Sequence, residues 1–173
     1  EDYLVHPTSL YGLANLMIEK YIELYYRKNN LNFVILRLSN VYGPRQWKSG
    51  IIPSIIAKLL KKERPIIYGN GIQTRDFIYI DDAISALILA TEKGKREIYN
   101  VGSNKEISFN EIFTVIKNLL DAKNSPIYKK STAQETQRSA MDIAKIKKEF
   151  GWQPKIDLKK GILKTIEWFQ KNE

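Results

Sequence analysis

The sequence predicts an α/β fold, because stretches with helical periodicity alternate along the chain with short apolar runs typical of buried strands. The composition agrees: of 173 residues, 43% are hydrophobic and 27% are charged, as in a globular protein rather than a disordered one. Glycine, proline and capping residues stand at many of the expected boundaries. At this length the chain is one ordinary domain that can bury a core.

The first expected helix runs from Ser9 to about Asn29. Its apolar residues recur at helical spacing: Leu13, Leu16, Met17, Tyr21, Leu24 and Tyr25. The next run, Phe33 to Leu38, has the β-branched content of a buried strand, and the turn signal YGP follows it. A second helix is expected over 51–62, and RPIIYGNG indicates a short strand that leads into a glycine turn.

The second half of the chain continues this alternation. TRDFIYIDDAISALILATEKG predicts a strand followed by a helix, with Asp81 as its N-cap and Gly94 at its end. EIYNVGS predicts another strand and turn, and the capping-box pattern SFNE at 108–111 opens a helix to about residue 120. Asp142 and Asp157 are expected to cap two more helices, the first of them closed by Gly151.

Composition also limits the kinds of site. Cysteine is absent, which excludes disulfides, thiolate nucleophiles and Cys-ligated zinc and fits a cytoplasmic protein. No apolar run approaches the roughly 20 residues of a membrane span, and no signal-peptide pattern occurs, so no membrane partner is expected. The single histidine, His6, has no metal partners in the sequence, and we interpret it as a surface residue.

The net charge of +9, from 28 Lys and Arg against 19 Asp and Glu, suits an anionic partner such as a diphosphate, a nucleic acid or a membrane surface. The basic residues are scattered over the polar faces of the expected helices, and no nucleic-acid motif accompanies them. We therefore interpret the charge as a solvated surface. A nucleic-acid-binding protein stays open as an alternative that rests on charge alone.

The stretch SLYGLANLMIEKY presents one tyrosine in a position suited to chemistry. Tyr11 and Asn15 are four residues apart, so they lie on one helix face, a turn apart. A tyrosine is a useful general base only if its pKa falls from about 10 toward the working pH. A lysine one turn away would lower it, whereas the amide of Asn15 carries no charge. Taken alone, the stretch is better explained as an ordinary helix that carries a tyrosine and an asparagine.

Three later stretches follow PTSLYG in a fixed order: LRLSNVYGPRQ, IIYGNGIQTRDFIYIDDAISA and MDIAKIKKEFGWQPKIDLKKGILKTIEW. From His6 to Trp168, these motifs together closely resemble the extended short-chain dehydrogenase/reductase family, specifically its nucleotide-sugar epimerases and dehydratases. Members similar to UDP-glucose 4-epimerase are the nearest match. The resemblance implies the C-terminal part of a Rossmann-type doubly wound sheet plus a smaller α/β substrate-binding domain. Residues 1–45 would end the NAD-binding domain, and 46–173 would bind the nucleotide sugar.

No glycine-rich fingerprint for a dinucleotide pyrophosphate occurs in the sequence, which also lacks an initial methionine. We therefore expect the chain to be the C-terminal half of such an enzyme, with the fingerprint and the catalytic Ser/Thr upstream. The isolated piece is expected to be inactive. The resemblance also implies that the full-length protein is a homodimer that contacts its partner through the Tyr11 helix.

By resemblance, Tyr11 falls on the catalytic tyrosine of a Tyr-x-x-x-Lys motif. It would take the proton of the sugar C4 hydroxyl while a hydride passes to NAD and later returns to the other face of the sugar. Asn15 falls on the lysine, so the chain departs from its family there. The expected contacts of NAD are Tyr11, Asn15 and Ser39. Lys20 lies nine residues beyond Tyr11, about 900° of rotation, and so on the opposite face.

The resemblance also implies a UDP-sugar site. Arg75, in QTRDF, falls on the arginine that holds the diphosphate, a task suited to a guanidinium fork, and we interpret Asp76 as structural. The other expected contacts are Asn40 for the sugar, Ile51, Ile66 and Tyr68 for the uridine pocket, and Glu135 for the ribose. Taken alone, each has a structural interpretation: an Arg75–Asp76 ion pair, a turn residue at Asn40, and core positions for the three uridine-pocket residues.

A second departure lies in TAQETQRSAMD. Related enzymes place Arg-Pro-Gly-Glu or Arg-Pro-Gly-Asp here. In this chain the arginine position falls on Thr132 and the acidic position on Glu135. Arg138, Lys129 and Lys130 are the candidates to supply the missing positive charge.

The leading hypothesis is an NAD-dependent UDP-sugar 4-epimerase that acts by transient hydride transfer from sugar C4. A nucleotide-sugar 4,6-dehydratase is the nearest alternative, and it needs an Asp/Glu acid–base pair upstream. A third possibility is a degenerate UDP-sugar-binding protein without catalysis, which the departures at Asn15 and Thr132 favour.

Overall fold

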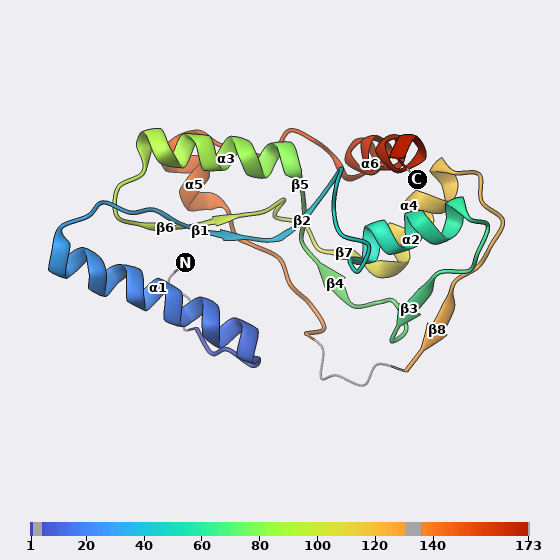
Figure 1. The fold of residues 1–173 in the computed structure, drawn as a ribbon, viewed down its shortest axis with the longest axis horizontal. Coiled ribbons are helices and arrows are strands. Elements are labelled where there is room, and N and C mark those ends of the chain that lie inside the picture. The colour runs from blue at the N-terminus through green and yellow to red at the C-terminus, as the bar shows by residue number, and fades with distance from the viewer. Residues whose placement is uncertain (2–4, 131–135, 173) are drawn as a thin grey trace.

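A computed structural model describes residues 1, 5–130 and 136–172 and has the predicted α/β architecture (Figure 1). The described helices are α1 (Leu10–Asn29), α2 (Ile51–Leu60), α3 (Ile80–Lys93), α4 (Phe109–Leu119), α5 (Ala144–Phe150) and α6 (Leu158–Asn172). The described strands are β1 (Ile35–Leu38), β2 (Asn40–Tyr42), β3 (Ile66–Tyr68), β4 (Thr74–Arg75), β5 (Phe77–Tyr79), β6 (Ile98–Val101), β7 (Ile107–Ser108) and β8 (Ile127–Lys129).

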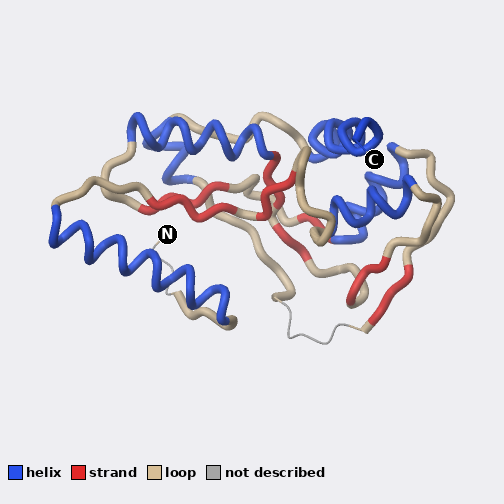
Figure 2. The backbone as a smooth tube through the Cα atoms, viewed as in Figure 1, coloured by secondary structure: helices blue, strands red, loops and turns tan. Residues whose placement is uncertain are grey.

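The strands pair across long sequence separations. β1 pairs with β6, β2 with β5 and β3 with β8, all parallel, whereas β4 and β7 are antiparallel. Figure 2 shows the β1–β6 and β2–β5 pairs at the centre of the molecule and the β3–β8 pair at its lower right edge. The chain changes partner at Ser39, whose backbone nitrogen donates to Val101, while the next nitrogen, that of Asn40, donates to Asp76. Ser39 therefore lies where the β1–β6 pair meets the β2–β5 pair.

Two hydrophobic clusters form the core. One joins α2, α4 and α6 and includes the fully buried Phe169. The other joins α3, α5 and β6 and includes Tyr99. In Figure 1, α1 lies on one side of the β1–β6 pair and α3 on the other. Both clusters contain or contact residues from each of the predicted domains, 1–45 and 46–173, and that division stays a prediction.

Several predicted helix ends are confirmed. Ser9 is the N-cap of α1, and its Oγ accepts a hydrogen bond from the Gly12 nitrogen at 3.1 Å. The capping box at the start of α4 is formed in both directions between Ser108 and Glu111. Gly151 ends α5 with φ of +70°, a conformation that favours glycine. These ends depend on contacts within one or two turns, which explains why local sequence predicts them.

Other local predictions were wrong. Tyr79, not Asp81, is the N-cap of α3. Asp81 lies in the first turn, where its negative charge interacts favourably with the positive end of the helix dipole. The N-cap of α5 is Ile143, although the Asp142 carboxylate accepts from the Ala144 nitrogen at 2.8 Å. β2 comprises Asn40–Tyr42 and so overlaps the predicted YGP turn at Tyr42. β8 was not predicted. Both strands depend on partners distant in the sequence.

The described helices include none with the length and apolar content that crossing a bilayer requires.

Candidate active site

The predicted substrate residues gather around one pocket of about 320 Å³, which we name the Arg75 pocket. Its lining comes from strands β2 to β5, from α2 and α4, and from the loop before α2. It consists of Asn40, Ser49, Ile51, Ser54, Ile66, Tyr68, Arg75, Phe77 and Phe109. Five of these residues were predicted from the sequence to contact a nucleotide sugar. The sixth predicted residue, Glu135, lies outside the described residues.

Arg75 is held by the backbone rather than by an acid. Its Nη1 donates to the carbonyl oxygens of Thr74 and Thr136, both at 2.7 Å. The guanidinium carbon lies 5.7 Å from the centre of the Phe109 ring. Within the described part of the chain, Arg75 has no ion-pair partner, and its Nε and Nη2 donate no hydrogen bond. The arginine therefore keeps both its charge and part of its fork for an anion.

Asp76 has the structural role predicted for it. Its carboxylate is buried and accepts hydrogen bonds from the backbone nitrogens of Ser103, Asn104 and Met141 and from the Ser103 hydroxyl. It forms no ion pair with Arg75, so that structural interpretation of Arg75 is excluded. The carboxylate instead ties two loops to the junction between β4 and β5.

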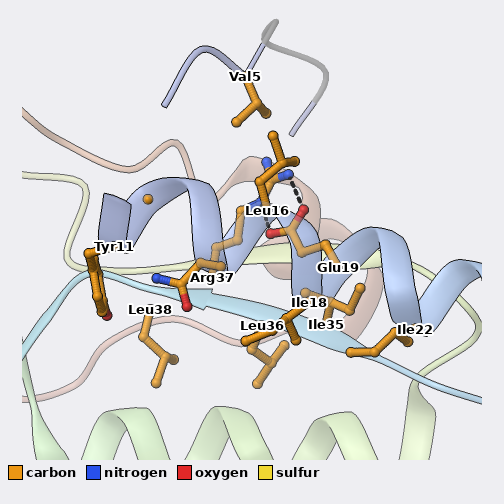
Figure 3. Close-up of a pocket in the computed structure, with 12 residues that line it drawn as sticks. Val5, Tyr11, Leu16, Ile18, Glu19, Ile22, Ile35, Leu36, Arg37 and Leu38 are labelled. Carbon is orange, nitrogen blue, oxygen red and sulfur yellow. Dashed lines mark hydrogen bonds and ion pairs between the residues drawn. The ribbon is translucent and has the colours of Figure 1, made fainter. Parts of the chain in front are cut away.

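A second pocket, of about 480 Å³, lies between α1 and β1, and we name it the Tyr11 pocket (Figure 3). Tyr11 and Asn15 both line it, as the shared helix face predicts. Tyr11 is 80% exposed, so its hydroxyl is open to a ligand. Lys20 is not among the lining residues and pairs with Glu23 at 3.0 Å. It does not replace the missing lysine.

Ser39 is an unusual polar residue at the end of β1. Its Oγ is buried and has no hydrogen-bond partner in the described part of the structure. A buried hydroxyl without a partner is costly, and a polar ligand group would remove that cost. This observation fits the predicted contact with a cofactor. Tyr11, Asn15 and Ser39 are the residues available to such a group.

The second departure from the family pattern, at Thr132 and Glu135, falls outside the described residues. Arg138 pairs with Glu106 through two hydrogen bonds of 2.8 and 3.2 Å, which raises the pKa of Arg138 and lowers that of Glu106. The charge of Arg138 is therefore already matched by an acid in this structure.

Sequence reasoning missed four residues of the Arg75 pocket: Ser49, Ser54, Phe77 and Phe109. Ser54 follows Ile51 by three residues on α2, so helical spacing could have indicated it. Phe109 opens α4 directly after the capping serine, but nothing local indicates that it faces Arg75. For Ser49 no signal in the sequence was available.

The sequence pattern of the NAD dependent epimerase/dehydratase family matches residues 1–102, and the chain belongs to this family. A relative named "Putative UDP-glucose 4-epimerase", from Methanocaldococcus jannaschii, is 42% identical over 99% of this chain and 57% of its own length. The human dTDP-D-glucose 4,6-dehydratase is 35% identical over 96% of this chain and 49% of its own length. The chain thus spans about half the length of these relatives.

Solved structures confirm the predicted fold class. UDP-glucose 4-epimerase from Thermotoga maritima, determined with UDP-glucose, is similar with a TM-score of 0.94 and 35% identity, over 96% of this chain and 55% of that one. A dTDP-glucose 4,6-dehydratase from Bacillus anthracis, determined with NAD, has a TM-score of 0.93 and 31% identity, over 100% of this chain and 56% of that one.

Proposed function

We propose that this chain supplies the nucleotide-sugar site and the tyrosine helix of an NAD-dependent UDP-sugar 4-epimerase. One observation carries the proposal: Asn40, Ile51, Ile66, Tyr68 and Arg75, each expected to contact a UDP-sugar, line a single pocket. The similarity to UDP-glucose 4-epimerases supports the same substrate class.

In the proposed complex, Arg75 binds the diphosphate through the Nε and Nη2 N–H groups, which donate no hydrogen bond within the described part of the chain. Charge-assisted hydrogen bonds of this kind are about twice as strong as neutral ones and fix the orientation of the phosphates. Ile51 and Ile66 supply apolar surface for the uridine, and Tyr68, which is 54% exposed, borders the same space. Asn40 is placed by its own hydrogen bond to Asp76 and meets the sugar.

Tyr11 acts in this proposal as the acid and base at the sugar C4 hydroxyl. It removes the hydroxyl proton as the C4 hydrogen leaves, and it returns the proton after the sugar has turned over. NAD, when bound, would supply the acceptor and later the donor of the hydride. Tyr11, Asn15 and Ser39 would hold it, the last through its buried and unpartnered hydroxyl. With Asn15 in place of lysine, no ammonium group lies one turn from Tyr11 to promote proton transfer.

The proposal is tested by incubating the full-length protein with NAD and UDP-glucose and measuring UDP-galactose. Tyr11→Phe is expected to abolish product, because it removes the proton acceptor and little else from an exposed side chain. Tyr21→Phe is the matched control, since Tyr21 is also exposed on α1 but lines a different pocket. An active Tyr11→Phe protein would refute the assigned role.

A 4,6-dehydratase is a second candidate, because several relatives of about 30–35% identity are named dTDP-glucose 4,6-dehydratases. Conversion of dTDP-glucose to a 4-keto-6-deoxy sugar, with no epimer from UDP-glucose, would favour it. Binding of UDP without turnover of either substrate would favour a non-catalytic binding protein.

A homodimer is also part of the proposal. Much of the apolar surface of α1 is exposed on the described chain, which leaves this helix free to contact another subunit. The exposed residues are Leu10, Leu13, Met17, Ile18, Tyr21, Leu24 and Tyr25. Sedimentation of the full-length protein as a monomer would contradict it.

A further inference from the structure

The most buried residue of α1 is charged. Among the residues of this helix, Glu19 alone is classed as buried, at 9% exposure, while most of the apolar residues remain open to solvent. The Glu19 carboxylate meets the Arg37 guanidinium of β1 through two hydrogen bonds of 2.7 Å, one from Nε to Oε1 and one from Nη2 to Oε2 (Figure 3). This paired, charge-assisted geometry makes a strong and directional polar contact between α1 and the sheet.

Glu19 lies on the same helix face as the two residues of the proposed cofactor site. Tyr11, Asn15 and Glu19 follow one another at intervals of four, and all three line the Tyr11 pocket. Arg37 lies in β1, two residues before Ser39. The ion pair therefore forms a direct link between α1, which carries Tyr11, and β1, which precedes Ser39.

Within the described part of the chain, α1 is held to the sheet by little apolar burial. Because little apolar surface of α1 is buried on the described chain, its hydrophobic contribution to docking is small. A side chain that is bonded at both carboxylate oxygens has a defined position, and so does the backbone that carries it.

We infer that Glu19 and Arg37 form a positioning pair that fixes α1 on β1 and so sets the Tyr11 hydroxyl relative to the reacting sugar. Neither residue needs to touch substrate for this role. The inference rests on the proposed function where it concerns turnover, but the docking of α1 by this pair can be measured without it.

The kinetic test uses Glu19→Gln in the full-length protein. Misplacement of a reacting group by about 1 Å can lower a rate by about a hundredfold, so kcat is expected to fall at least about tenfold. KM for the UDP-sugar is expected to stay within about twofold, because the lining of the Arg75 pocket includes neither α1 nor β1. Glu23→Gln, which breaks the exposed Lys20–Glu23 pair on the same helix, is the matched control and should leave both constants unchanged.

A double variant exchanges the two charges of the pair between the two positions. Glu19→Arg combined with Arg37→Glu keeps the opposite charges at the same two sites, and it is expected to recover kcat relative to either single reversal. Recovery supports a positional role. If the Glu19→Gln protein keeps its full kcat, or if kcat and KM deteriorate together in every variant, the inference is wrong.

Hydrogen exchange separates this inference from the proposed function. In Glu19→Gln, the amides of α1 are expected to exchange about tenfold faster or more, while those of α4 keep the parent rate. If the parent protein converts no sugar nucleotide but α1 loosens in this way, the proposed function fails and the positioning pair stands. Unchanged exchange in α1, or equal acceleration in α1 and α4, would overturn the inference in either case.

Discussion

The backbone nitrogen and the side-chain amide of Asn40 both donate hydrogen bonds to the carbonyl oxygen of Asp76, at 3.0 and 2.9 Å. The first bond belongs to the parallel ladder of β2 and β5, and the second adds a side-chain contact to the same acceptor. The amide plane of Asn40 is thereby fixed next to the residue that follows Arg75. Its Oδ1 makes no hydrogen bond with the described protein, so it remains available to a sugar hydroxyl.

Asn40→Ala should therefore weaken sugar binding without unfolding the protein. Loss of one such hydrogen bond costs about 1 kcal/mol, so KM for the UDP-sugar should rise about fivefold. Asn124→Ala is the matched control, because Asn124 also donates to a backbone carbonyl, that of Lys62 at 2.8 Å, and lines no part of the Arg75 pocket. Equal KM values for Asn40→Ala and the control would exclude Asn40 from the site.

The buried carboxylate of Asp76 is expected to stabilise the fold rather than the chemistry. Asp76→Asn replaces one of the two acceptor oxygens by an NH2 donor, which would face either the backbone nitrogen of Ser103 or those of Asn104 and Met141. We expect the free energy of unfolding to fall by about 2–4 kcal/mol, from the cost of buried groups that lose their partners. Asp121→Asn, at a side chain that is 95% exposed, should change it by less than about 0.5 kcal/mol. Similar denaturation midpoints for both variants would contradict this account.

The capping box of α4 predicts a pH dependence of stability. Hydrogen bonds from the Ser108 nitrogen and hydroxyl, each 2.7 Å, hold the pKa of Glu111 below its ordinary value of 4.5. On acidification, the unfolded chain therefore binds this proton at a higher pH than the folded chain does. The Glu111 hydrogen bonds contribute fully to stability above the unfolded-state pKa, and this contribution is lost as pH falls through the folded-state pKa. Glu111→Gln should flatten the fall in unfolding free energy below about pH 5. Denaturation curves that run parallel to those of the parent would refute this.

Asn15→Lys should increase turnover if the active site is otherwise intact. An ammonium one turn from Tyr11 lowers the tyrosine pKa, and each unit corresponds to about 1.4 kcal/mol, or tenfold in proton-transfer equilibrium. We expect kcat of the full-length protein to rise about tenfold or more. Leu13→Lys is the control, because it adds the same charge at an exposed position about 200° around the helix from Tyr11. No gain, or an equal gain in both variants, would favour a protein that has lost its catalytic role.

Local signals predicted much of the fold. The N-cap of α1 at Ser9, the capping box at Ser108 and Glu111, and the end of α5 at Gly151 all depend on neighbours within a few residues. The short strands β2 and β8 escaped prediction because pairing with distant strands, not propensity, makes them strands.

The candidate site was predicted by family resemblance more than by periodicity. Resemblance assigned Arg75 and Asn40, whereas nothing local places Phe109 against Arg75. Glu19 was missed for a different reason. A glutamate on a helix is normally expected to be exposed to solvent, and only folding brings Arg37, eighteen residues away, into contact with Glu19.

The central claim is that Arg75 holds the diphosphate of a UDP-sugar, and calorimetric titration of the full-length protein with UDP tests it most directly. Arg75→Ala should weaken UDP binding about 10- to 100-fold, since hydrogen bonds to charged groups contribute about 1.5–3 kcal/mol. Arg64→Ala is the matched control, because Arg64 also donates to two backbone carbonyls but lies outside the Arg75 pocket. With uridine, which lacks the diphosphate, the parent and Arg75→Ala proteins should bind alike. Equal UDP affinities for the parent and Arg75→Ala would contradict the account.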